Sequence, residues 1–226
     1  MRLKDTGLTV ADIKAKINKY HIETYERMDF LCDHAKGNYL YDENGDAYLD
    51  FYGGVAVNSV GSCNDEVVAA VQQQVADVMH TFNYPYTIPQ ALVAEKICKA
   101  TGMDKIIFQN SGAEANEAMI KMARKYGAEN FGPNKVEIIT FLSSFHGRTG
   151  YAMTTTGQPG SAIHKGFGEL PTGFKYVEYN NLKAVEDAIT ENTIAVMLEP
   201  VQGEGGVIPA TQEFMTGLRK LCDDKG

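Results

Sequence analysis

Residues 136–148 read V-E-I-I-T-F-L-S-S-F-H-G-R, an apolar run followed at once by a polar turn that contains glycine. Similar apolar runs occur at 105–109 (K-I-I-F-Q), 174–179 (F-K-Y-V-E-Y) and 193–198 (T-I-A-V-M-L). Short runs of this kind are typical of strands that are buried on both faces of a parallel sheet. Helical patterns are expected between and after them, at 112–126, 182–189 and 213–225. This alternation predicts an α/β fold, with a mostly parallel sheet covered by helices on both faces.

The N-terminal part of the chain has a different pattern, which predicts a small α+β segment. Residues 11–20 predict a short helix, and two alternating runs flank Asn44-Gly45, which predicts a hairpin. A helix capped by Asn64 or Asp65 follows, and another is expected from Pro89 to about Ala100.

The composition is that of an ordinary soluble globular protein, with 44% hydrophobic and 22% charged residues in 226 and a net charge of -8. Acidic and basic residues are mixed along the chain, so we expect no nucleic-acid or anionic-membrane partner. No apolar stretch has the length that a membrane span needs, and no secretory signal is present. The four cysteines form no C-x-x-C pair, so we expect no metal site and reduced thiols in a cytoplasmic protein.

Three polar motifs follow the predicted strands. In the first, Asn110-Ser111-Gly112-Ala113-Glu114, Ser111 and Glu114 form the sequence pattern of a helix capping box. Gly112 leaves space above the first amides of the helix, where an anion such as a phosphate is favoured. A capped helix that binds nothing has the same local pattern.

The second motif, Ser144-Phe145-His146-Gly147-Arg148, offers an aromatic ring that can stack on a planar cofactor. Its arginine can bind a carboxylate through two hydrogen bonds. An ordinary exposed loop is the alternative interpretation.

The third motif, Glu199 to Gly206 (E-P-V-Q-G-E-G-G), places two carboxylates and an amide on a glycine-rich bend, although a solvated turn would also account for it. In a parallel sheet the motifs that follow the strands lie along one edge. A phosphate site, a stacking ring and a carboxylate site at one edge indicate a phosphorylated aromatic cofactor and an amino-acid substrate.

Together the strings N-S-G-A-E-A-N-E (110–117), F-H-G-R (145–148) and E-P-V-Q-G-E-G-G (199–206) resemble the class III aminotransferases of fold type I, which use pyridoxal 5'-phosphate. The hairpin sequence Y-L-Y-D-E-N-G-D-A-Y-L-D-F (39–51) is also similar to that family. The resemblance runs from about Glu23 to Gly226. It implies that residues 1–60 are the N-terminal segment of a small domain, and that 61–226 are the first part of a large cofactor-binding domain that is truncated at its C-terminus.

The resemblance also implies roles for individual residues. Gly112 and Ala113 would bind the cofactor phosphate through their amides, with Ser111 supporting the turn. Phe145 would stack on the pyridine ring, and Glu199 would support the cofactor end of the pocket. The substrate residues would be Arg148, which holds the α-carboxylate, together with Tyr25, Val55 and Glu204, the last of which takes part in switching the pocket between its two substrates.

The acetylornithine and ornithine aminotransferases are the subgroup with the greatest resemblance. Tyr25 stands where those enzymes carry a tyrosine near the substrate. Val55 stands where ornithine δ-aminotransferases have a tyrosine and acetylornithine-type enzymes an aliphatic residue, so it favours an N-acetylornithine-like donor, with 2-oxoglutarate as acceptor, as in arginine biosynthesis. The 4-aminobutyrate and other ω-amino-acid aminotransferases share the aliphatic residue and remain an alternative, as does a core valine without a role in binding.

Two departures from the family pattern matter. Gly61-Ser62-Cys63-Asn64-Asp65 replaces the usual G-H-x-H-P turn, which puts the entry to the next helix in doubt. The family's D-E-x-Q motif and its Schiff-base lysine would lie beyond Gly226, so no lysine here is assigned a catalytic role. We therefore expect these 226 residues alone to be inactive, and a homodimer only at full length. The remaining alternatives are an aminomutase or decarboxylase, and a non-catalytic part that binds phosphate compounds.

Overall fold

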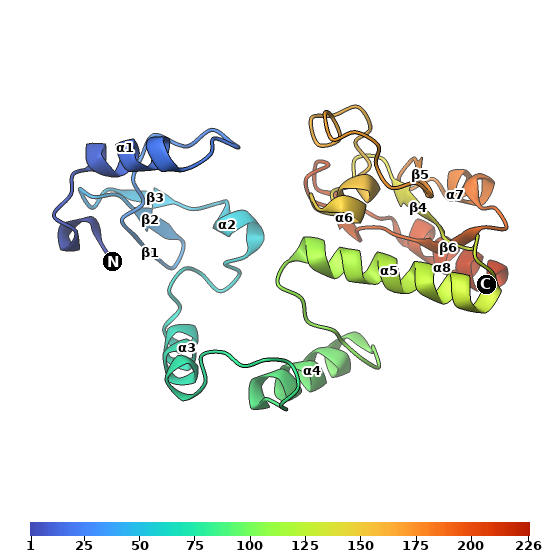
Figure 1. Ribbon diagram of the computed structural model, residues 1–226, viewed down its shortest axis with the longest axis horizontal. Helices are drawn as coiled ribbons and strands as arrows, with labels where there is room; N and C mark the ends of the chain where they lie inside the picture. Colours follow the sequence, from blue (N-terminus) through green and yellow to red (C-terminus); the bar gives the residue numbers. More distant parts are fainter. The chain divides into compact units, whose positions relative to one another are not determined.

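The computed structural model describes all residues, Met1–Gly226. The chain divides into two compact units, unit 1 (Met1–Ala91) and unit 2 (Leu92–Gly226), and Figure 1 labels the elements of each. The assignment of residues 1–60 and 61–226 to a small and a large domain stays a prediction. None of the helices combines the length and the apolar character that a membrane span requires.

Unit 1 begins with a helical pair and a small antiparallel sheet. A 3-10 turn, η1 (Leu3–Asp5), precedes helix α1 (Val10–Tyr20), which starts with a capping box between Thr9 and Asp12. The sheet has the order β1 (His34–Lys36), β2 (Tyr39–Tyr41) and β3 (Ala47–Leu49). The hairpin at Asn44-Gly45 is confirmed, and the carboxylate of Asp42 stabilises it by accepting hydrogen bonds from the amides of Asn44 and Asp46, both at 2.9 Å.

The rest of unit 1 is helical. A short turn, α2 (Gly53–Ala56), leads to α3 (Asp65–Asp77), and α4 (Ile88–Thr101) crosses into unit 2. The doubt about the entry to α3 is removed, because the side chain of Asn64 accepts hydrogen bonds from the amides of Glu66 (3.1 Å) and Val67 (3.2 Å). The apolar residues that repeat at helical spacing along α3 and just after its end are exposed, namely Val67, Val68, Val71 and Val75 on the helix and Val78 and Met79 beyond it.

Unit 2 is built on a three-stranded parallel sheet. Strand β4 (Glu137–Phe141) lies between β5 (Phe174–Val177) and β6 (Thr193–Val196) and is parallel to both. The remaining elements are α5 (Gly112–Phe131), α6 (Gly150–Thr155), α7 (Leu182–Ala188), β7 (Val201–Gln202), β8 (Ile208–Pro209) and α8 (Gln212–Lys225). The predicted parallel α/β fold is therefore confirmed.

Helices cover both faces of this sheet. On one face, Ile138 and Met197 pack with Ile120 of α5 and Tyr151 of α6. On the other, the core consists of Ile139, Phe141, Val185, Phe214 and Leu218, with residues contributed by α7 and α8. The rings of Phe141 and Phe214 meet edge to face with centroids 5.7 Å apart. Adjacent residues of β4 point to opposite faces, which explains why its run is apolar without alternation.

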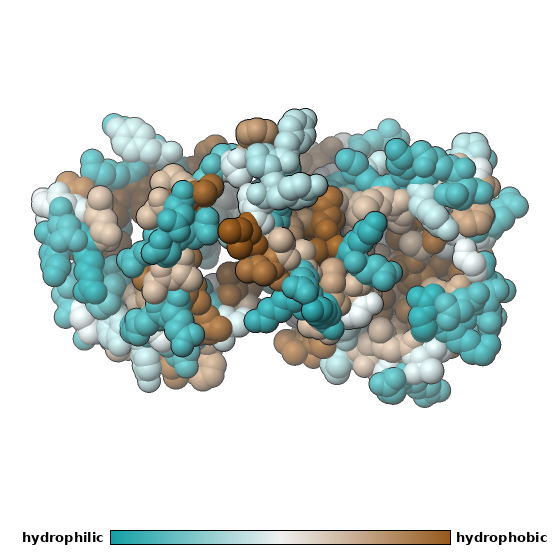
Figure 2. All heavy atoms as spheres, turned by 90° about the horizontal axis from the view of Figure 1, so that it is seen from below, coloured by the Kyte–Doolittle hydropathy of each residue, from teal (hydrophilic) through white to brown (hydrophobic).

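One prediction for unit 2 is wrong. Residues 105–109 form no strand, because no other strand of the chain pairs with them, and Ile107 and Phe108 are exposed. The apolar residues that share one face of α5, namely Ala115, Ala118, Met119, Met122 and Tyr126, do not form the buried face of that helix. Apolar (brown) side chains are accordingly visible at the molecular surface in Figure 2.

The buried face of α5 depends on a glycine. A Cβ atom at Gly127 would overlap the carbonyl oxygen of Lys135 and lie 2.9 Å from Cγ1 of Ile194. Only hydrogen at this position lets α5 approach β6 and the segment before β4 so closely.

We therefore expect Gly127→Ala to lower the free energy of unfolding of unit 2 by about 1–3 kcal/mol, despite the better helix propensity of alanine. Gly150→Ala is the matched control, because a Cβ atom there meets no atom within 4 Å. Urea unfolding followed by circular dichroism measures both, and equal stability of the two variants would contradict the packing described for α5.

Candidate functional site

The candidate site of unit 2 lies beyond the carboxyl ends of β4 and β6. Residues 144–148 follow β4, and residues 199–206 follow β6. The turn 110–114 joins them from the start of α5, although it does not follow a strand. The expected convergence of the three motifs is therefore present, and the first motif is positioned by contacts from its helix instead of by a strand.

The turn before α5 presents free backbone donors. Ser111 caps the helix, with its hydroxyl oxygen accepting from the amide of Glu114 at 3.2 Å. The amides of Gly112 and Ala113 donate to no group of the chain. A Cβ atom at Gly112 would meet nothing within 4 Å, so the space above these amides is open. Free amides at the start of a 20-residue helix fit an anionic group such as a phosphate.

Only half of the predicted capping box forms. The carboxylate of Glu114 does not accept from the amide of Ser111; it accepts from the Ser111 hydroxyl (3.2 Å) and from the side-chain amide of Asn110 (3.4 Å). The Glu114 carboxylate is occupied by these side-chain partners, and the Ser111 amide has no acceptor in the chain.

His146 is the buried centre of the second motif, with 5% of its surface exposed. Its amide donates to the hydroxyl of Thr156 at 2.9 Å, and its Nε2 lies 3.3 Å from Oγ1 of Thr140. The Thr140 hydroxyl donates its only proton to the carbonyl of Thr155, at 2.9 Å. Thr140 must therefore accept from His146, which places the imidazole proton on Nε2.

Burial also decides the charge of this ring. Desolvation lowers the pKa of His146 below its ordinary value, and the negative charge of Glu199 opposes this shift only in part. His146 is therefore a neutral structural member of the loop.

The third motif supports the second from the side of β6. The two carboxylate oxygens of Glu199 accept from the amides of Phe145 (2.8 Å) and Gly203 (3.1 Å). Buried Gln202 donates to the carbonyl of Leu142 at 2.9 Å. Gly205 lies so close to the loop after β4 that a Cβ atom there would overlap the carbonyl oxygen of Ser143. Glu199 thus fixes the backbone of Phe145, in agreement with a supporting role.

The side chains that remain available are Phe145, Arg148 and Glu204. Phe145 is half-buried, and the guanidinium of Arg148 lies 6.0 Å from the centroid of its ring. Arg148 and Glu204 are exposed, and neither forms a hydrogen bond or ion pair within the chain. An unpaired guanidinium beside a partly exposed ring fits the recognition of a carboxylate next to a planar group.

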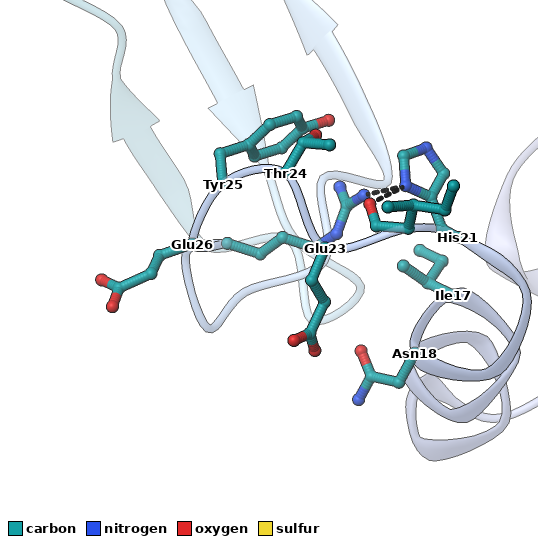
Figure 3. A pocket seen from close by; sticks show the side chains of 9 residues that line it. Ile17, Asn18, His21, Glu23, Thr24, Tyr25 and Glu26 are labelled. Carbon is teal, nitrogen blue, oxygen red and sulfur yellow. Dashed lines mark hydrogen bonds between the residues drawn. The ribbon is translucent and has the colours of Figure 1, made fainter. Parts of the chain in front are cut away.

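Tyr25 lies in unit 1, where it lines a pocket of about 600 Å³ with residues of α1 and of the segment that follows it. Figure 3 shows Ile17 and Asn18 reaching this pocket from α1, with Glu23, Thr24 and Tyr25 around it. The guanidinium of Arg27 lies 5.0 Å from the Tyr25 ring centroid and donates to Nδ1 of His21 at 3.1 Å. The substrate role of Tyr25 stays a prediction.

Val55 is also in unit 1, and it is exposed by 61%, so the alternative of a core valine is wrong. Its backbone is left-handed, with φ 58° and ψ 56°. Gly53, Gly54 and Ala56 also have positive φ, so residues 53–56 form one left-handed turn. Such a conformation costs a β-branched residue about 1–2 kcal/mol, and strain of this kind is frequent at functional sites.

Sequence reasoning missed several residues that hold the site together. They are Asn116, Glu117, Thr140 and the three threonines of A-M-T-T-T-G (152–157), namely Thr154, Thr155 and Thr156. A run of threonines next to a short helix was a usable signal, because their hydroxyls often bond to nearby backbone groups. Asn116 and Glu117 were part of the quoted string 110–117 but were given no role.

Comparison with known families places these motifs in context. Residues 20–226 match the family model described as aminotransferase class-III. An acetylornithine aminotransferase of Methanocaldococcus jannaschii is 45% identical over 207 residues, which are 92% of this chain and 52% of that protein. A succinylornithine transaminase of Photorhabdus laumondii is 43% identical over 204 residues, 90% of this chain and 50% of the relative.

Solved structures of related enzymes also match nearly the whole of this chain. The ornithine aminotransferase of Toxoplasma gondii matches with a TM-score of 0.90 and 28% identity, covering 98% of this chain and 53% of that one. The N-acetylornithine aminotransferase of Stenotrophomonas maltophilia matches with a TM-score of 0.74 and 33% identity, covering 92% and 51%. The chain spans about half the length of the curated relatives it matches.

The neutral state of His146 predicts a pH dependence. In the unfolded chain the imidazole takes up a proton near its ordinary pKa of about 6.5, whereas the folded site resists that proton. The contribution of neutral His146 to the unfolding free energy is therefore fully present above about pH 6.5. It is lost as the pH falls from there towards the lower pKa of the folded state. We expect His146→Gln to flatten the fall in unfolding free energy of unit 2 between pH 7 and pH 5.

The exposed His80→Gln is the matched control, and urea unfolding at several pH values is the measurement. A slope that is the same in wild type, His146→Gln and His80→Gln would show that His146 does not titrate differently in the folded state.

Proposed function

Because the chain belongs to the class III aminotransferases, we propose that unit 2 carries the cofactor-phosphate site and the substrate-carboxylate site of such an enzyme. The donor is an N-acetylornithine- or ornithine-like amino acid, the acceptor is 2-oxoglutarate, and the cofactor is pyridoxal 5'-phosphate. We further propose that these 226 residues are inactive by themselves and that the active enzyme is a homodimer.

One observation carries the proposal, namely the direct contact between the anion-binding turn and the loop of Arg148. A Cβ atom at Gly147 would lie 2.7 Å from Cβ of Ala113, so the loop rests against the turn. The turn with the two free amides and the backbone of the loop that carries Arg148 are therefore held next to each other, which suits a phosphorylated cofactor and a carboxylate substrate.

The residues of the chain would divide the binding work between them. The amides of Gly112 and Ala113 donate to the phosphate, and the Ser111 cap keeps both pointing outward. Phe145 covers the planar ring, while Glu199 holds the Phe145 backbone in place. When bound, pyridoxal 5'-phosphate supplies an electron-withdrawing ring that stabilises charge on the substrate carbon.

On the substrate side, Arg148 would bind the α-carboxylate of the donor and a carboxylate of 2-oxoglutarate in turn. In N-acetylornithine the α-amine is acylated, so only the terminal amine can be transferred. The donor becomes an aldehyde, and 2-oxoglutarate becomes glutamate. Glu204 lies exposed in the bend after β6 and is proposed to act in the exchange of the two substrates. Tyr25 and Val55 are proposed to contact the donor.

The substrate assignment rests on the relatives, among which acetylornithine aminotransferases are frequent, and on the aliphatic residue at Val55. We expect the polypeptide that the whole gene encodes to use N-acetylornithine with a higher kcat/KM than 4-aminobutyrate, measured by glutamate formation. The reverse order would favour the ω-amino-acid alternative.

Arg148→Ala is expected to raise the KM for both donor and 2-oxoglutarate about tenfold or more.

The phosphate site can be tested in the 226-residue chain itself. Gly112→Pro removes one free amide but suits the first position of a helix, and Ser111 already has the extended backbone that precedes proline. We expect this variant to keep the helix content and to bind pyridoxal 5'-phosphate about tenfold more weakly, measured by fluorescence titration.

Gly112→Ala is the matched control, because it keeps the amide and its Cβ atom enters open space. Pyridoxal without phosphate should bind wild type and Gly112→Pro equally. If Gly112→Pro and Gly112→Ala bind the phosphorylated cofactor with the same affinity, the amide of residue 112 is not a phosphate ligand.

A further inference from the structure

Two side chains of helix α5 that have no part in the binding roles given above bond to the chain on either side of Arg148. The side-chain amide of Asn116 donates to the carbonyl of His146 at 2.7 Å. At the next residue of the helix, Oε1 of Glu117 accepts from the hydroxyl of Thr149 at 2.7 Å and from the amide of Ala152 at 3.0 Å. These three bonds cover both sides of Arg148, from residue 146 to residue 152.

Glu117 takes the place of the usual cap of α6. Thr149 is the N-cap residue of this helix, but its side chain accepts no hydrogen bond from the first turn. Its hydroxyl is used to donate to Glu117, and Glu117 accepts the amide of Ala152, which is the third residue of α6. The carboxylate is thus a cap supplied by another helix, and its charge suits the positive end of the α6 backbone.

Gly147 brings the backbones of the two elements together. It has φ 127°, a region that glycine adopts without strain. A Cβ atom there would lie 2.7 Å from Cβ and 3.0 Å from Cα of Ala113, and 3.1 Å from Cβ of Ala152. The loop therefore rests on the residue that also presents an amide to the phosphate site.

We propose that Asn116 and Glu117 are positioning residues that hold the Arg148 loop and the first turn of α6 at a fixed distance from the phosphate-binding turn of the same helix. The inference rests on the proposed function and adds to it how the phosphate subsite and the carboxylate subsite are kept at a fixed distance from each other. The Arg148 side chain itself is exposed and has no hydrogen-bond or ion-pair partner in the chain, so the anchored backbone sets the point from which its guanidinium can reach a ligand.

A fixed distance between the two subsites matters because the substrate has to react with the bound cofactor. A displacement of about 1 Å between reacting groups lowers a rate by as much as about 100-fold. The cofactor phosphate would be held at residues 112–113 and the substrate carboxylate at residue 148. Glu117 lies on α5, whose first turn carries the proposed phosphate subsite, and it bonds to the segment that follows Arg148. This one side chain therefore helps to fix the distance between the two proposed subsites.

The test compares Glu117→Ala, Glu117→Gln and the matched control Glu129→Gln in the 226-residue chain. Glu129 is an exposed residue of the same helix whose ion-pair partner is Lys125, 3.5 Å away. Three quantities are measured: the hydrogen-exchange rate of the Ala152 amide, the affinity for pyridoxal 5'-phosphate, and the affinity of the cofactor-saturated chain for 2-oxoglutarate.

For Glu117→Ala we expect the Ala152 amide to exchange about tenfold faster or more, and the affinity for 2-oxoglutarate to fall by about the same factor. The affinity for pyridoxal 5'-phosphate should stay within about twofold of wild type, because the cap and amides at 111–113 are untouched. Glu117→Gln keeps an acceptor oxygen and should recover most of both losses. Glu129→Gln should match wild type throughout.

Two results would overturn the proposal. One is unchanged exchange of Ala152 together with unchanged affinity for 2-oxoglutarate in Glu117→Ala. The other is an equal loss of affinity for cofactor and 2-oxoglutarate, which would mean a general loss of structure. If the wild-type chain binds neither ligand, the proposed function fails on that ground, and the exchange rate of Ala152 alone decides whether Glu117 fixes α6.

Discussion

Strand β4 is the constraint on which unit 2 depends. It is hydrogen-bonded on both edges, to β5 and to β6, and both of its faces are covered by helices. A strand in this position has no freedom to shift by one residue, because such a slip would exchange the side chains of its two faces. The residues that follow Phe141 are therefore delivered to one fixed point at the edge of the sheet.

The loop at that point is held from three directions. Glu199 bonds to its backbone from the side of β6, Asn116 from α5, and Thr156 from the end of α6. His146 sits in the middle as a neutral ring, since burial lowers its pKa. Only the side chains of Phe145 and Arg148 make no hydrogen bond within this network. A rigid loop that presents one ring and one unpaired guanidinium is suited to binding, because little conformational entropy is lost when a ligand arrives.

Membership of the class III aminotransferases and the similarity to solved structures agree with this arrangement. The chain spans about half the length of these relatives, and the binding roles of its residues are proposals. Within the chain, the turn 110–114 and the Arg148 loop are joined by direct contacts. Their relative position is therefore a property of unit 2 itself, which makes both proposed subsites accessible to experiments on the 226 residues alone.

The sequence by itself determined the class of fold, most helices and strands, the hairpin at Asn44-Gly45, and the family. These features depend on local periodicity, on turn residues and on ordered motifs, which are legible along the chain. The strand expected at 105–109 failed because a strand exists only where another strand pairs with it. The buried face of α5 was missed because Gly127, and no apolar side chain, allows the close approach to β6.

The features of the candidate site also fall into those that the sequence indicated and those that only the tertiary structure decided. Phe145, Arg148, Glu199 and the turn 111–113 stood out in the sequence because their motifs are contiguous. The neutral state of His146, the half-formed capping box at Ser111 and the contacts of Asn116 and Glu117 came only from the tertiary structure. Each of them depends on a partner between 3 and 53 residues away or on exclusion of water, and neither a through-space distance nor the burial of a group is encoded in any local pattern.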